Sequence, residues 1–209
     1  MPLLPMCQPM RNFSVKAGPD HQYPRFKQLI GNTPLVDLTP MMKPNVHGVD
    51  VTVLGKCEFM NPGLSHKDRI VINMLDRAEA AGKIKQHSGC VLVAASSGNT
   101  GASVAMIGAM RGYRCVIITN DKCSVEKQDA ITMYGAELLV VPPGVCYMQK
   151  EIDLAEENPS WYPINQYDNL DNPEAHYLTT GPEIYHQSNK SITHFVMGAS
   201  TGGTISGVG

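Results

Sequence analysis

The sequence has no long apolar run and little excess charge of either sign. None of its apolar runs approaches the roughly 18 residues of a membrane-spanning helix, and the longest candidate, around residues 102–109, lies within an α/β pattern. The formal net charge of −2 argues against the broad basic surface of a nucleic-acid-binding protein. The 209 residues are 43% hydrophobic and 17% charged, which argues against disorder and allows one large domain or two small ones.

The cysteines and histidines show no pattern typical of a metal site. The six cysteines form no C-x-x-C pair, and they stand at positions 7, 57, 90, 115, 123 and 146. A chain of this length builds its own core without disulfides, so we expect free thiols in a reducing compartment. His176, His186 and His194 lack helical ligand spacing, and we expect surface or core histidines rather than metal ligands.

The first 20 residues contain four prolines and no compact apolar segment typical of a signal peptide. We interpret them as a flexible arm of a cytoplasmic protein. The basic residues Arg11 and Lys16 leave mitochondrial or plastid targeting open as the alternative.

From residue 51 onward, short β-branched runs alternate with segments of helical periodicity, which predicts an α/β fold with a doubly wound parallel sheet. The predicted strands are 51–57, 90–95, 115–119, 137–141 and 193–197. The predicted helices are 66–82, 100–112, 124–135, 147–157 and 172–188, the last of them interrupted near Gly181-Pro182.

The loops that follow strands in such sheets are the expected ligand sites. In the first unusual loop, residues 61–69, Ser65 is a good N-cap that places Lys67 in the first turn of a helix. The helix dipole and burial together lower the pKa of an amine there and make it a better nucleophile. The alternative is an exposed lysine that pairs with Asp68 or with nothing.

Two further loops carry hydroxyl groups and glycines. Residues 95–101 offer polar side chains and free N–H groups at a helix N-terminus, which favours a carboxylate or phosphate over a merely capped turn. In residues 198–204, glycines and the hydroxyls of Ser200, Thr201 and Thr204 predict a cradle for a small phosphorylated cofactor. This loop has neither the Walker nor the dinucleotide-binding pattern.

Together these motifs resemble the fold-type II pyridoxal-phosphate enzymes, specifically the cysteine synthase and cystathionine β-synthase family. The resemblance runs from Leu29 to Gly209. Its motifs are residues 30–35 (IGNTPL), 58–63 (EFMNPG), 65–69 (SHKDR), 97–101 (SGNTG), 135–137 (GAE), 165–169 (NQYDN), 172–177 (NPEAHY), 181–184 (GPEI) and 201–204 (TGGT).

The resemblance implies two doubly wound α/β domains like those of tryptophan synthase β, and it implies pyridoxal 5′-phosphate as cofactor. By the same resemblance, Lys67 is the Schiff-base lysine and the base for the substrate α-proton, and Asn99 binds the cofactor's ring hydroxyl. The implied phosphate ligands are Ser200, Thr201, Gly202, Gly203 and Thr204. The implied substrate-carboxylate ligands are Ser96, Ser97, Gly98, Thr100 and Gln166. Ser96 stands where relatives usually carry threonine, and Ser200 stands where glycine is common.

The implied reaction is β-replacement, in which an amino-acid substrate loses its β-substituent and a sulfide or thiol adds. The leading hypothesis is a cysteine synthase, which converts O-acetylserine and sulfide to cysteine and acetate. Cystathionine formation from serine and homocysteine is the alternative within this chemistry. A non-catalytic truncated paralogue that acts through protein association, or a module that senses an amino acid, is the alternative from another class.

The resemblance also predicts the domain organisation. We expect a flexible arm (1–24), a segment that contributes to the C-terminal domain (25–57), an N-terminal α/β domain (58–165) and an incomplete C-terminal domain with the phosphate loop (166–209). Family members continue beyond this loop and supply the hydroxyl that meets the pyridine nitrogen. We therefore expect a fragment or short product whose full-length form is a homodimer, with no nucleic-acid or membrane partner.

Overall fold

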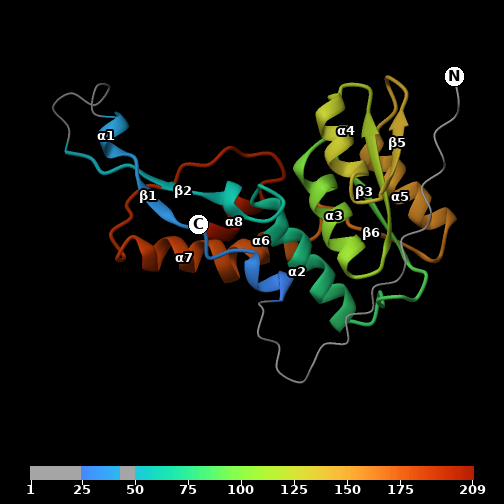
Figure 1. Ribbon diagram of the computed structural model, residues 1–209, viewed down its shortest axis with the longest axis horizontal. Coiled ribbons are helices and arrows are strands. Elements are labelled where there is room, and N and C mark those ends of the chain that lie inside the picture. Colours follow the sequence, from blue (N-terminus) through green and yellow to red (C-terminus); the bar gives the residue numbers. More distant parts are fainter. Residues whose placement is uncertain (1–24, 43–49) are drawn as a thin grey trace, which may run out of the picture.

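The computed structural model describes residues 25–42 and 50–209, which form two groups of elements (Figure 1). One group is a parallel sheet with helices on both faces, at the right of the figure. The other holds a small antiparallel pair of strands together with the helices near the C-terminus. Among the described residues, no helix is both long enough and apolar enough to cross a membrane.

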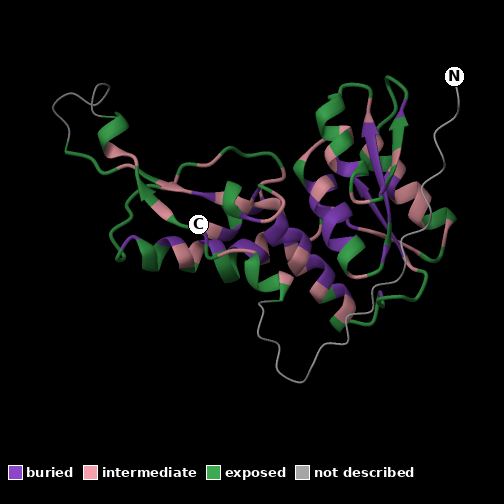
Figure 2. Ribbon diagram, viewed as in Figure 1, coloured by how far each residue is buried: buried purple, intermediate pink, exposed green. Residues whose placement is uncertain are grey.

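The parallel sheet has the strand order β5-β4-β3-β6. Its strands are β3 (Val91–Ala95), β4 (Arg114–Asn120), β5 (Glu137–Val141) and β6 (Trp161–Pro163). In the register, Val91 is paired with both Arg114 and Trp161. All five residues of β3 are buried (Figure 2), because helices cover both faces of this central strand.

The two faces of the sheet carry separate apolar cores, since successive side chains of a strand point to opposite sides. Leu92 and Ala94 of β3 face the larger core, which lies under α2 (Lys67–Ala80), α3 (Asn99–Met110) and α4 (Val125–Thr132). Val91 and Val93 face the smaller core, which α5 (Tyr147–Glu157) covers from the other side. The predicted doubly wound α/β fold is therefore confirmed.

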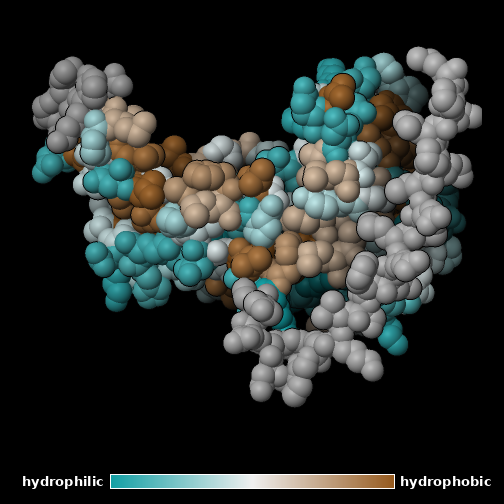
Figure 3. All heavy atoms as spheres, viewed as in Figure 1, coloured by the Kyte–Doolittle hydropathy of each residue, from teal (hydrophilic) through white to brown (hydrophobic). Residues whose placement is uncertain are grey.

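The second group begins with the 3₁₀-helix Phe26–Leu29 and the antiparallel strands β1 (Leu35–Asp37) and β2 (Leu54–Lys56). Its helical elements include α1 (Thr39–Met42), the 3₁₀-helix Glu58–Met60, α6 (Asp171–Ala175), the π-helix His176–Thr180, α7 (Gly181–Gln187) and α8 (Gly203–Val208). Helix α2 joins the two groups, because it packs against both α3 and α6. Apolar side chains remain exposed over β1 and β2 (Figure 3), including Val36 and Leu54.

Two predicted strands are wrong. Residues 51–57 contain only the short strand β2, which pairs antiparallel with β1 and lies outside the parallel sheet. Residues 193–197 form no strand, because no described strand lies beside them to complete a ladder, and Val196 is 91% exposed. The strands β1 and β6 were not predicted, since each has only three residues.

The predicted interruption near Gly181-Pro182 is confirmed, since a π-helix separates α6 from α7, which begins at Gly181. Pro182 lies in the first turn of α7, where a missing N–H group costs nothing. The irregularity is the π-helix immediately before it, and π-helical turns occur often at functional sites. The predicted domain boundaries stay a prediction, and the predicted N-terminal arm lies outside the described residues.

Candidate active site

Lys67 is the first residue of α2. The hydroxyl of Ser65 accepts the backbone N–H of Lys67 at 3.2 Å, although the helix's N-cap is His66 rather than Ser65 as predicted. Burial lowers the pKa of the Lys67 ammonium. Within the described part of the chain its Nζ atom has no ion-pair partner, so the amine is available as a nucleophile.

Asp68 does not pair with Lys67 but fixes the loop before it. Its carboxylate accepts the Gly63 backbone N–H at 2.6 Å and the Ser103 hydroxyl at 2.6 Å. Burial raises the pKa of Asp68, and these two hydrogen bonds partly offset that effect. A Cβ atom at Gly63 would lie 2.3 Å from Asp68 Oδ1, so only glycine allows this close approach.

The loop at residues 95–101 is held largely by its own side chains. Ser96 Oγ accepts the backbone N–H groups of Gly98 at 3.2 Å and Gly101 at 3.0 Å. Thr100 Oγ1 donates to Gln166 Oε1 at 2.7 Å, and Gln166 Nε2 donates to the Ala95 carbonyl at 3.0 Å. The structure thus brings the predicted substrate residues Ser96, Thr100 and Gln166 together.

The other predicted residues of this loop lie nearer the surface. Asn99 is exposed at the start of α3, while Ser97 and Gly98 are half-buried. The first N–H groups of a helix have no partner inside that helix. This part of the loop can therefore offer backbone N–H groups to an anion, whereas the Ser96 and Thr100 hydroxyls already have protein partners.

Glu151 supports the same site, although sequence reasoning did not single it out. It lies on α5 and is only 3% exposed, and its carboxylate accepts the backbone N–H groups of Ala95 at 2.8 Å and Asn165 at 2.6 Å. Burial raises the pKa of Glu151, and these bonds oppose the increase. One carboxylate therefore holds the ends of β3 and β6, next to Ser96 and Gln166.

The predicted phosphate loop is fixed by Asn172, a second residue that was not singled out. Gly202 has φ +78° and precedes α8, a conformation that favours glycine. Asn172 Nδ2 donates to Thr201 Oγ1 at 3.1 Å and to the Gln166 carbonyl at 2.8 Å. Asn172 therefore connects the predicted phosphate loop with the predicted substrate site.

His176 contacts the same loop from the π-helix. It is completely buried, with Nδ1 2.8 Å from Thr180 Oγ1 and Nε2 3.2 Å from Thr204 Oγ1. Its ring centroid lies 5.9 Å from that of His66, beside Lys67. Burial lowers the pKa of His176 to about 3, and positive charge on His66, Arg69 and Lys67 adds to the decrease. His176 is thus a core histidine whose two nitrogens are both bonded.

These three loops match the pattern of a known family. A family model described as "Pyridoxal-phosphate dependent enzyme" matches residues 26–209. The chain belongs to this family. Its members use pyridoxal phosphate, which confirms the predicted cofactor class and the resemblance on which it was based.

Among the relatives of this pyridoxal-phosphate dependent enzyme, cysteine synthase B of Escherichia coli (strain K12) is 45% identical over 185 residues, 87% of this chain and 59% of that protein. Cystathionine beta-synthase of Apis mellifera is 40% identical over 186 residues, 86% of this chain and 36% of that protein. The solved structure of O-ureido-L-serine synthase matches with a TM-score of 0.78 and 35% identity, covering 89% of this chain and 58% of that one. The chain thus spans less than two thirds of each.

The described residues fit the family's cofactor. An amine of lowered pKa stands at Lys67. The ring of the preceding residue, His66, lies 5.9 Å from that of His176, which contacts Thr204 of the glycine-rich turn. Asn172 Oδ1 is buried without a hydrogen-bond partner. A Cβ atom at Gly203 would lie 2.0 Å from this oxygen, so glycine alone lets the loop backbone approach there.

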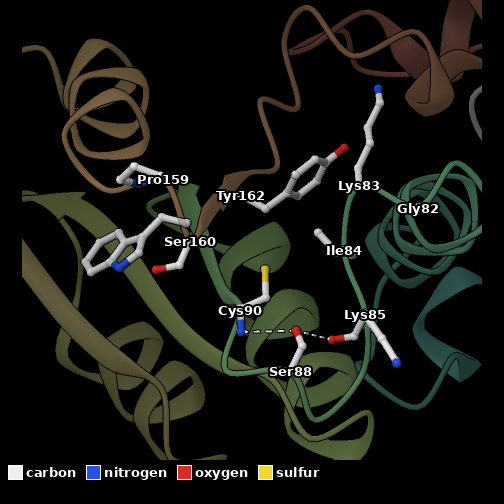
Figure 4. A pocket seen from close by; sticks show the side chains of 10 residues that line it. Gly82, Lys83, Ile84, Lys85, Ser88, Cys90, Pro159, Ser160 and Tyr162 are labelled. Atoms are coloured by element: carbon white, nitrogen blue, oxygen red, sulfur yellow. Dashed lines mark hydrogen bonds between the residues drawn. The ribbon is translucent and has the colours of Figure 1, made fainter.

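A pocket of about 550 Å³ lies elsewhere (Figure 4). It is at the amino ends of β3 and β6, and its lining includes Lys83, Lys85, Ser88, Cys90 and Tyr162. The two lysine side chains point away from each other, and the Ser88 hydroxyl is bonded within its own turn. Since these polar groups do not converge, this pocket is not the candidate active site.

Proposed function

We propose that this protein uses pyridoxal phosphate for β-replacement on a serine derivative, with cysteine formation from O-acetylserine and sulfide as the leading reaction. The convergence of three loops carries the proposal. Asn172 connects the Thr100–Gln166 pair with the loop at residues 200–204. His176 contacts the same loop, and its ring lies near that of His66, the residue before Lys67. The relatives named cysteine synthase support the choice of reaction.

Each loop has a distinct task in this proposal. The residues that hold the cofactor are Lys67, Asn99, Ser200, Thr201, Gly202, Gly203 and Thr204. When bound, the cofactor withdraws electrons from the substrate α-carbon. The Lys67 amine, whose pKa burial lowers, is the group that would accept the α-proton. The residues that bind and orient the substrate carboxylate are Ser96, Ser97, Gly98, Thr100 and Gln166.

Cystathionine formation from serine and homocysteine is the second candidate. It is favoured by the 40% identity to a cystathionine beta-synthase and by residues 122–127 and His176-Tyr177, which are similar to that family's loops. The two reactions use the same lysine and the same carboxylate site. They differ only in the β-substituent that leaves and in the thiol that adds.

The first test measures cofactor binding by the full 209-residue chain. We expect the visible absorbance band of lysine-bound pyridoxal phosphate in the wild type and its loss in Lys67→Ala. Lys85→Ala is the matched control, because Lys85 is exposed and lies in the distant pocket. A band that persists in Lys67→Ala would contradict the assignment of this lysine.

The second test identifies the reaction. The chain with cofactor is assayed for cysteine from O-acetylserine and sulfide, and for cystathionine from serine and homocysteine. Turnover of the first pair supports the leading reaction, and turnover of the second pair alone supports the alternative. Binding of the amino acid without turnover of either pair would support the sensing module instead.

A further inference from the structure

His176 lies between the two ends of the proposed cofactor site. Its ring stands near that of His66, which precedes Lys67, and its Nε2 atom contacts Thr204 in the phosphate loop. The ring is completely buried, and it belongs to a π-helix rather than a regular helical turn. None of the proposed chemical steps uses it, so its burial and its two polar contacts require another explanation.

The hydrogen-bond partners of His176 leave a choice between two neutral tautomers. The hydroxyl of Thr204 has one proton, and a phosphate dianion accepts hydrogen bonds but donates none. If Nε2 carries the proton, it donates to Thr204 Oγ1 at 3.2 Å and leaves the hydroxyl proton of Thr204 for the phosphate. The Thr180 hydroxyl, 2.8 Å away, then donates to Nδ1. In the other tautomer Thr204 must donate to the imidazole instead.

We propose that His176 is a positioning residue whose Nε2–H group holds the Thr204 hydroxyl as a hydrogen-bond donor to the cofactor phosphate. This inference rests on the proposed function, because it assumes that the phosphate lies in the loop at residues 200–204. It assigns His176 no contact with substrate or cofactor. The imidazole acts only through Thr204.

The surroundings of His176 keep the ring neutral. Burial disfavours the imidazolium, and His66, Arg69 and Lys67 add repulsion, while Glu58 is the only opposing charge of consequence among the described residues. A charged ring would donate from both nitrogens, and Nδ1 could no longer accept from Thr180. The neutral form is the one in which the Thr180 hydroxyl donates to Nδ1 while Nε2 donates to Thr204.

The close packing of α8 on the π-helix holds Thr204 next to His176. A Cβ atom at Gly207 would lie 2.8 Å from His176 Cβ and 2.2 Å from the Pro173 carbonyl oxygen. Asn172, four residues before His176, holds Thr201 of the same loop. Its unpartnered Oδ1 atom is buried against Gly203, a second and independent sign that this surface is built around the loop.

The first test needs no cofactor. Long-range ¹H–¹⁵N NMR of the histidine side chains in the full chain distinguishes protonated from unprotonated ring nitrogens. We expect one ring with protonated Nε2 and bare Nδ1, unchanged between pH 8 and pH 6, whose signals disappear in His176→Gln. A ring that is protonated at Nδ1 or charged at pH 6 would overturn the inference.

The second test compares cofactor binding in three variants. His176→Leu removes the donor and Thr204→Val removes the hydroxyl. His176→Gln keeps an amide N–H at about the reach of Nε2. We expect the leucine and valine variants to bind pyridoxal phosphate roughly ten- to a hundredfold more weakly. The ³¹P resonance of the bound phosphate should shift in both, and the glutamine variant should restore the affinity and the resonance.

The double variant separates positioning from general support of the fold. His176→Leu should weaken binding little further when Thr204 is already valine, because both changes remove one chain of hydrogen bonds. Equal affinity and an unchanged ³¹P resonance in His176→Leu would overturn the inference and leave the proposed function intact. If the wild type itself binds no pyridoxal phosphate, the proposed function and the role of Thr204 fail together. Thr204→Val keeps the test decisive if His176→Leu does not fold.

Discussion

Replacement of Arg69 by methionine tests whether the start of α2 depends on a buried ionic cluster. The Arg69 side chain is 1% exposed, and its guanidinium binds two carboxylates in bidentate fashion. Nε and Nη2 donate to Glu58 at 2.7 and 2.8 Å, and Nη1 and Nη2 donate to Glu183 at 2.8 Å each. The cluster ties the Lys67 segment to α7 and, through Glu183, to the backbone of Asn32.

The magnitude follows from what Arg69→Met leaves behind. Glu183 keeps Lys56 at 2.7 Å, but Glu58, whose side chain is 18% exposed, loses its cation. Removal of one partner from a buried ion pair typically costs about 3–5 kcal/mol of unfolding free energy. The control is Arg114→Met, whose pair with Glu137 is more than half exposed on both sides and should contribute far less to the free energy of unfolding.

The pH dependence gives the sharper test. Burial raises the pKa of Glu183, but hydrogen bonds from Arg69 and Lys56 outweigh this and lower it to about 2, against an ordinary value of 4.5. The stabilisation by Glu183 is therefore present above pH 4.5 and is lost as the pH falls toward 2. In Arg69→Met, Glu58 stays partly buried without its cation, which raises its pKa. The destabilisation caused by the Glu58 charge therefore disappears as the pH falls and the carboxylate is protonated.

The expected measurement is the free energy of unfolding by denaturant for the wild type and both variants between pH 7 and pH 3. The deficit of Arg69→Met should be largest at pH 7 and should shrink as the pH falls. A deficit that stays constant across this range, or one no larger than that of Arg114→Met, would refute the reasoning about the cluster.

Two further changes test the loops of the site. Glu151→Gln places an amide where two backbone N–H groups need acceptors. Substrate titration should therefore show amino-acid binding weakened by about 1–3 kcal/mol. The control Glu156→Gln, an exposed position on the same helix, should have no effect. Gly203→Ala places a Cβ atom 2.0 Å from Asn172 Oδ1, so cofactor affinity measured by absorbance should fall, whereas Gly198→Ala meets no atom within 4 Å and should bind normally. Equal affinities in the two alanine variants would contradict the packing argument.

The sequence predicts those parts of the fold whose residue pattern is compatible with only one kind of structure. The run Val91–Ala95 is apolar throughout, and such a run between two helical segments fits a strand covered on both faces. The glycine-rich turn before α8 is recognisable because Gly202 adopts a positive φ that few other residues allow. The loop at residues 95–101 directly follows β3, so its place at the carboxyl edge of the parallel sheet could be predicted from the order of elements.

The wrong and missing elements depend on partners that a single segment does not reveal. Residues 193–197 have the same β-branched composition as a buried strand, but a strand forms only where a neighbour completes its ladder. The three residues of β6 are too few for a periodic signal, and they pair only because β3 lies beside them. Local composition therefore predicts the propensity of a segment to form a strand, but not whether another strand pairs with it.

The supporting polar residues of the site were missed because their roles are tertiary. Glu151 lies on the same helical face as Leu154 and Ala155, three and four positions further on. A charged residue on an apolar helical face was therefore the one feature of the sequence that could have indicated its role. For Asn172 and His176 the motif NPEAHY was visible, but it does not reveal which loop these side chains contact. Those contacts join residues almost thirty positions apart in the sequence.

The spacing of Asn172 and His176 explains how the phosphate loop acquires its shape. Residues four apart on a helix lie on one face, so both side chains point toward the loop at once, and they contact Thr201 and Thr204. The side chains of α6 and the π-helix therefore hold the hydroxyls of Thr201 and Thr204. We therefore expect phosphate binding by the predicted loop to depend on the segment at residues 171–180 as well as on the glycine-rich loop itself.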